Sequence, residues 1–115
     1  MIKRSQSTGG AMPPAPGWGV VADVTARVAA VRFEWADRSL SCPYAAFTRW
    51  EWTRGEPETL VITTRKERIV LSGRGLETVR DALDSGKLQV IRAQGERHTA
   101  VAGGTWIEAI KVEAQ

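Results

Sequence analysis

Residues 46–83, AFTRWEWTRGEPETLVITTRKERIVLSGRGLETVRDAL, decide the fold, because they hold three strand-like runs followed by one helix. The first run contains Trp50 and Trp52, which are two residues apart and therefore project from one face of an extended strand. Residues 54–57 then bring glycine and proline, which favour a turn. The pattern predicts a half-buried strand that ends in this turn.

Two further strands are expected directly after it. Residues 59–65 alternate, with Leu60, Ile62 and Thr64 on one face, and are rich in β-branched side chains. Only two polar residues separate this run from a third one at 68–71. A parallel connection needs roughly a dozen residues or more, so the two runs are predicted to form a tight antiparallel hairpin.

The apolar period then changes from that of a strand to that of a helix. We expect a helix over about residues 75–85, with Gly86 just past its end, where a left-handed cap is common. Such a short helix is stable only when its apolar stripe packs on the sheet, while Arg80 and Asp84 should face solvent. The stripe consists of Leu76, Val79, Ala82 and Leu83.

The flanking segments add more strands to the same architecture. Residues 26–35 and 39–44 alternate on either side of a short polar turn and predict a second hairpin. Pro43 indicates that the second of these strands ends there or lies at a sheet edge. Further strands are expected at 87–93 and 99–102.

The last predicted strand covers residues 105–113, with Trp106, Ile110 and Val112 on one face. Together the runs predict an α+β, mostly antiparallel domain. We expect six to eight strands in a small bent sheet or partly open barrel, with the one helix as a cap.

The chain has 115 residues, which suits one domain. Residues 1–17 are rich in Gly, Pro and Ser and are expected to be a disordered tail. Residues 18–115 are expected to form a single β-rich domain, with a core at 27–92 and a C-terminal strand extension at 99–113. The net charge is +3, but Lys3 and Arg4 both lie in the tail, so the body is nearly neutral.

No apolar run approaches the length of a membrane-spanning helix, so no membrane insertion is expected. The single cysteine, Cys42, excludes an intramolecular disulfide and fits a cytoplasmic protein. Neither Cys42 nor the single histidine, His98, has a recognisable catalytic partner in the sequence. The first is better interpreted as a small buried hydrophobe, and the second as an exposed loop residue. We therefore expect no enzyme, no metal site and no cofactor.

The run of strands ending in a helix resembles a small pleckstrin-homology-like domain of the kind found in uncharacterised bacterial proteins. The resemblance rests on TLVITTRKERIVLSGRGLETVRDAL at residues 59–83 and covers residues 27–85. That fold ends on its helix, whereas strands follow the helix here. The resemblance therefore implies that residues 87–115 are an extension, which pairs with a sheet edge in this chain or in another one.

Two groups of residues are candidates for binding. Arg49, Trp50, Trp52 and Arg54 combine aromatic and cationic side chains, which can stack nucleobases or anchor a protein interface. The alternative is that at least one of these tryptophans belongs to the core.

Arg74 and Gly75 stand where a strand leads into the helix, and helix N-termini can hold anions. The better interpretation is a turn that needs glycine. The 65–68 run, RKER, is interpreted as a solvated turn.

These observations favour a non-enzymatic interaction module that acts in a protein assembly, with the chain itself as the expected partner. The chain has many aromatic residues and more strands than a small closed fold needs, and unpaired strand edges are readily satisfied by another chain. The alternative is a small β-barrel that binds nucleic acid through its Trp/Arg face.

Overall fold

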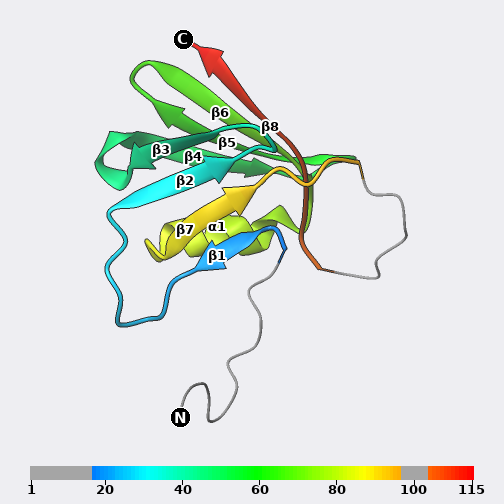
Figure 1. Cartoon of the computed structure of the whole chain (residues 1–115). Coiled ribbons are helices and arrows are strands. Elements are labelled where there is room, and N and C mark those ends of the chain that lie inside the picture. The colour runs from blue at the N-terminus through cyan, green and yellow to red at the C-terminus, as the bar shows by residue number, and fades with distance from the viewer. Residues whose placement is uncertain (1–16, 97–103) are drawn as a thin grey trace.

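The computed structural model describes residues 17–96 and 104–115. The predicted tail, apart from Gly17, and the predicted strand at 99–102 lie outside these residues. The described chain is α+β and mostly antiparallel, as predicted, and its strands form two four-stranded sheets (Figure 1). In chain order the elements are β1 (Gly19–Val21), β2 (Ala30–Glu34), β3 (Ser39–Pro43), the 3-10 turn η1 (Tyr44–Ala46), β4 (Phe47–Thr53), β5 (Glu58–Thr64), β6 (Glu67–Arg74), α1 (Leu76–Asp84), β7 (Leu88–Arg92) and β8 (Trp106–Ala114).

The first sheet has the strand order β1-β7-β2-β3, and the second has the order β4-β5-β6-β8. The second sheet is antiparallel throughout, and the predicted hairpin between β5 and β6 is confirmed. In the first sheet, β2 and β7 run parallel, because the chain passes through the second sheet and the helix before β7 returns beside β2. The turn η1 is the corner where the chain leaves β3 for β4.

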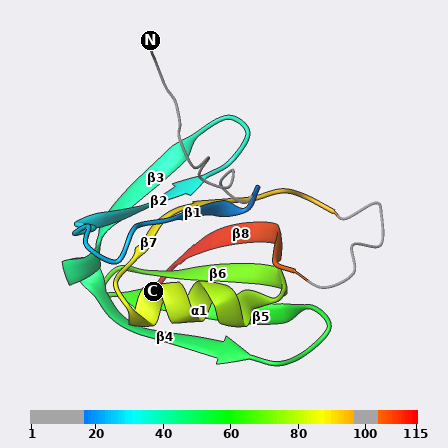
Figure 2. The ribbon, with the colours of Figure 1, turned by 90° about the horizontal axis from the view of Figure 1, so that it is seen from below.

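The core lies between the inner faces of the two sheets. Helix α1 lies over the second sheet in Figure 2, and its buried side chains are part of this core. The helix contacts β4 and β5 of the second sheet and β7 of the first. The prediction for Arg80 is wrong, since this side chain is half-buried over Trp52, whereas Asp84 is exposed as expected. The four residues of the predicted stripe are all buried: Leu76, Val79, Ala82 and Leu83.

The second hairpin, β2 with β3, is confirmed, and Pro43 is the last residue of an edge strand. Strand β2 begins later than predicted, because the amide of Ala26 donates to Asp23 O and closes a turn there. Strand β6 continues through Gly73 to Arg74, where the sequence predicted a turn. A Cβ atom at Gly73 would lie 2.0 Å from the carbonyl oxygen of Trp106, so this glycine lets β8 approach closely.

The last strand, β8, pairs with β6 of the same chain along nearly its whole length. The register shifts between Ser72 and Gly73, so that Glu108 has no partner in β6. This bulge moves the inward face by one residue. Ile107 and Ile110 are buried in the core, and the expected inward position of Trp106 is wrong. The helix in the described residues is too short to cross a membrane.

Candidate functional site

Of the predicted Trp/Arg face, the structure brings Trp52 and Arg54 together, with Trp50 on the same face of β4, but it does not bring Arg49 to them. Trp50 and Trp52 lie on the inner face of β4 and are half-buried against the core. Arg49 projects from the opposite face, where it pairs with Glu51 at 3.2 Å. The indole Nε1 of Trp50 donates to Asp84 Oδ1 at 2.7 Å, which ties β4 to the end of α1.

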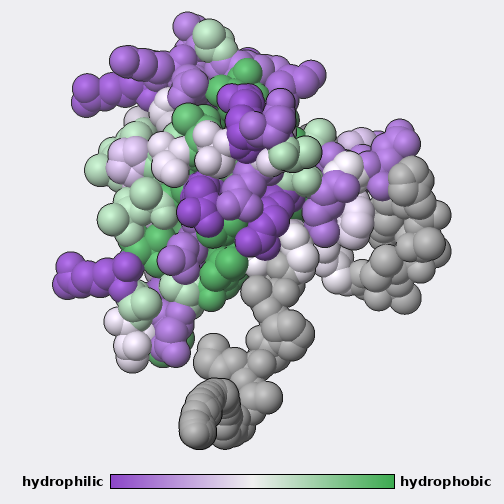
Figure 3. All heavy atoms as spheres, in the orientation of Figure 1, coloured by the Kyte–Doolittle hydropathy of each residue, from purple (hydrophilic) through white to green (hydrophobic). Residues whose placement is uncertain are grey.

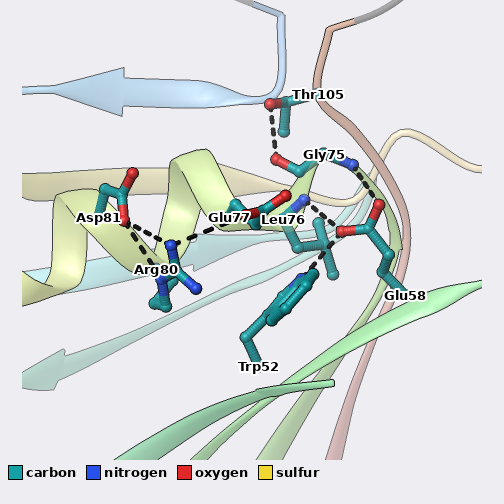
Figure 4. Close-up of polar contacts among 8 residues, drawn as sticks. All are labelled: Trp52, Glu58, Gly75, Leu76, Glu77, Arg80, Asp81 and Thr105. Atoms are coloured by element: carbon teal, nitrogen blue, oxygen red, sulfur yellow. Dashed lines mark hydrogen bonds and ion pairs between the residues drawn. The ribbon is translucent and has the colours of Figure 1, made fainter. Parts of the chain in front are cut away.

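Trp52 is held by its neighbours on both its edge and its face (Figure 4). Its Nε1 donates to Glu58 Oε1 at 2.9 Å. The guanidinium carbons of Arg80 and Arg54 lie 5.4 and 5.8 Å from the ring centroid, within the range of a cation–π contact. Arg54 and Arg80 therefore already lie against the Trp52 ring on which a nucleobase would stack.

The predicted anion position at the start of α1 is also occupied from within the chain. Gly75 precedes the helix at φ 64° and has no side chain to cap it. The Glu58 carboxylate accepts instead, from the Gly75 amide at 3.0 Å and the Leu76 amide at 2.9 Å (Figure 4). Arg74 pairs with Glu56 at 3.2 Å. This end of the helix thus has its anion in place.

Burial alone would raise the pKa of Glu58, but the hydrogen bonds donated by Trp52, Gly75 and Leu76, with Arg74 nearby, lower it on balance. The carboxylate is therefore charged at neutral pH. One side chain fixes both Trp52 and the helix N-terminus, so this cluster is a structural joint between β4, β5 and α1.

Cys42 lies in β3 with its side chain buried, as predicted. Burial raises the pKa of its thiol, and the charge of Glu67 raises it further, so the reactive thiolate is disfavoured at neutral pH. His98 lies outside the described residues. Among the residues that are described, no three His, Cys, Asp or Glu side chains gather closely enough to hold a metal ion.

The outer edge of β3 is a feature that the predicted site residues did not include. In the antiparallel ladder with β2, the Trp35 amide donates to Arg38 O and the Tyr44 amide to Ala29 O. By alternation, Leu40 and Cys42 also bond to β2, while the backbone groups of the residues between them point away from β2. Those residues are Ser39, Ser41 and Pro43, and β3 has no neighbouring strand on that side among the described elements.

A groove of about 460 Å³ lies beside this edge. Leu40, Cys42 and Ala46 give it apolar walls, and two cations and one carboxylate also line it, namely Arg65, Lys66 and Glu67. Figure 3 shows one face of the molecule, on which apolar and strongly hydrophilic side chains are interspersed. The groove therefore combines free backbone groups, apolar contact area and positive charge.

The β5–β6 turn beside the groove is fixed by hydrogen bonds within the chain. Thr64 is only 6% exposed, and its Oγ1 accepts from the Lys66 amide at 3.2 Å and the Glu67 amide at 3.0 Å. The Gln115 amide donates to Lys66 O at 2.9 Å, so the end of the chain braces the same turn. The sequence indicated the edge through Pro43 and predicted the turn at 65–68, but not that both line one groove.

Comparison with known proteins adds no assignment. No family model matches the chain, and no curated protein or solved structure matches it either. The resemblance to a pleckstrin-homology-like domain therefore stays a prediction.

Proposed function

We propose that this chain is a non-enzymatic interaction module that acts in a protein assembly, most simply a homo-oligomer. The observation that carries the proposal is the open edge of β3 beside an apolar groove. Backbone donors and acceptors on such an edge gain most by pairing with a strand of another chain. A cytoplasmic setting fits the single cysteine, whose thiol is buried.

The geometry favours this function over the nucleic-acid-binding alternative. Stacking on bases needs an accessible aromatic face. Trp50 and Trp52 are half-buried, and both indole groups donate to carboxylates of the chain. Arg49 projects from the face of β4 opposite to these tryptophans, so it cannot add its charge to their surface.

Sedimentation velocity over a wide range of protein concentration tests the proposal. We expect the average mass to rise from that of one chain toward a multiple of it. Binding of a fluorescent single-stranded oligonucleotide is measured in parallel at low and high salt. A chain that stays monomeric at every concentration and binds the oligonucleotide with a steep salt dependence would support the alternative instead.

A further inference from the structure

We propose that two copies of this chain associate by pairing their β3 strands antiparallel, about a two-fold axis at Ser41. This inference rests on the proposed function and specifies its partner, a second copy, and its contact surface. A two-fold contact uses the same surface on both copies, so each feature of one edge must match a feature of the other.

The backbone of β3 fits this pairing. With the axis at Ser41, the Ser41 amide of each copy donates to the Ser41 carbonyl of the other. The Ser39 amide of each copy donates to the Pro43 carbonyl of the other. Proline has no amide proton, so it can only accept at this position. The outward amides of β3 thus all have acceptors in the other copy. The ladder ends at Pro43, which has no amide proton to donate.

The inner side chains favour this register over the one with its axis at Leu40. With the axis at Ser41, Leu40 of one copy lies opposite Cys42 of the other, and both are apolar groups lining the groove. Moving the axis to Leu40 would place Cys42 opposite Arg38 of the second copy. Arg38 is charged and stacks on Trp35 at 4.0 Å, so this register would set a charge against an apolar wall.

Charge complementarity supports the same register. In it, the turn of one copy that carries Asp37 lies near the end of the other copy's β3 that leads into η1, where Ala45 lines the groove together with Arg65, Lys66 and Glu67. Asp37 is exposed, and the structure records no ion pair for it among the described residues. The Asp37 carboxylate of one copy therefore approaches two cations and one carboxylate of the second copy, a net attraction that occurs twice by symmetry.

The other described sheet edges are less suited to strand addition. Strand β1 has only three residues. The edge strand β4 is regular only over residues 49–53, because its register shifts between Phe47 and Arg49, and its outer face carries the charged pair of Arg49 and Glu51, which hinders strand addition. The far side of β8 is partly used, because Trp35 Nε1 donates to Ile110 O and the Gln94 amide donates to Ile107 O.

Disulfide trapping tests the register directly. In a Cys42→Ala background, Ser41→Cys and Ser39→Cys each place one thiol on the same exposed face of β3. Directly opposed hydrogen-bonded residues have Cα atoms about 5.5 Å apart, which permits a disulfide. Ser41→Cys should therefore form a covalent dimer rapidly under mild oxidation. Ser39→Cys is the matched control and should stay largely monomeric. In the proposed dimer, position 39 of one copy and position 39 of the other lie about four residues apart along the ladder, or roughly 13 Å.

A charge exchange at the ends of the strand provides the second measurement. Asp37→Lys should raise the dimer dissociation constant about tenfold, and adding Lys66→Glu in the same chain should restore most of the loss. Cross-linking at Ser41→Cys with this rescue supports the inference. An oligomer that forms without either effect would overturn the inference but leave the proposed function standing, whereas a chain that stays monomeric would overturn both the inference and the homo-oligomeric form of the proposed function.

Discussion

Glu58 joins two strands to the helix, because its carboxylate accepts hydrogen bonds from one side chain and from two backbone amides at the start of α1. Its partners are Trp52, Gly75 and Leu76. Charge-assisted hydrogen bonds of this kind are stronger than neutral ones. The helix preceded by a glycine thus obtains from β5 the cap that its own sequence lacks.

We predict that Glu58→Gln lowers the free energy of unfolding by about 1–2 kcal/mol at neutral pH, because the amide keeps the shape but loses the charge. The folded-state pKa of Glu58 lies below its ordinary value of 4.5. Its contribution is therefore complete above the unfolded-state pKa and is lost as the pH falls through the folded-state pKa. Urea titrations at several pH values should show the difference from wild type shrinking in acid. A constant difference across that range would contradict this role, and Glu51→Gln, on an exposed residue, serves as the control.

For single residues, the sequence predicted toward which face of a strand a side chain points, but not which group that side chain contacts. The spacing of Trp50 and Trp52 correctly placed both on one face of a strand. Alternation cannot reveal which groups lie across from them, because the acceptor of Trp50 is Asp84, at a sequence separation of 34 residues. Arg74 and Gly75 were correctly recognised as the start of a helix, but the anion that satisfies this helix start comes from another strand.

Among the elements, α1 is the one whose burial the sequence predicted best. Its stripe follows the helical period, and Leu83 is only 1% exposed. We predict that Leu83→Ala costs about 2–5 kcal/mol of unfolding free energy, the range for a buried leucine. Thermal or chemical denaturation measures this cost against Thr78→Ala on the exposed side. A loss no larger than that of the control would mean that the helix is not docked on β4 and β5.

Strand β8 shows where alternation fails as a guide. The bulge at Glu108 moves the inward positions to Ile107 and Ile110, and the sequence signals it only through the charge of Glu108, which interrupts the predicted apolar face. The physical cause lies in β6, where Gly73 lets the backbone of β8 come close. The predicted pairing of this strand with a sheet edge is confirmed, and that edge belongs to β6 of the same chain.

We predict that Ile107→Ala destabilises the chain by about 2–5 kcal/mol, because this side chain is fully buried. The exposed neighbour Ala109 provides the control as Ala109→Ser, which should change the unfolding free energy by less than about 0.5 kcal/mol. Equal, small effects of the two substitutions would contradict the bulged register.

For the whole molecule, the sequence predicted the α+β class, the antiparallel hairpins and the helix. It did not predict that the strands divide into two sheets, nor that β7 would insert beside β2 in parallel. Such pairings join segments far apart in the chain, and local period carries no information about them. The same limit applies to the groove, which forms where β3 meets the β5–β6 turn.

The placement of β8 within the chain changes which edge is available for assembly. With β6 already paired, β3 remains the strand that ends its sheet beside an apolar groove. We therefore propose β3 as the edge through which copies of this chain associate. In a single chain, the Ser39 and Ser41 amides point away from β2, whereas those of Leu40 and Cys42 bond to it.

Amide hydrogen exchange of wild-type protein, measured residue by residue by NMR at increasing concentration, tests this claim most directly. The Leu40 and Cys42 amides should be protected at every concentration. The Ser39 and Ser41 amides should exchange quickly in dilute solution and become protected as the concentration rises. If the Ser41 amide exchanges equally fast in dilute solution and at concentrations where the chain is oligomeric, β3 is not the contact between the copies.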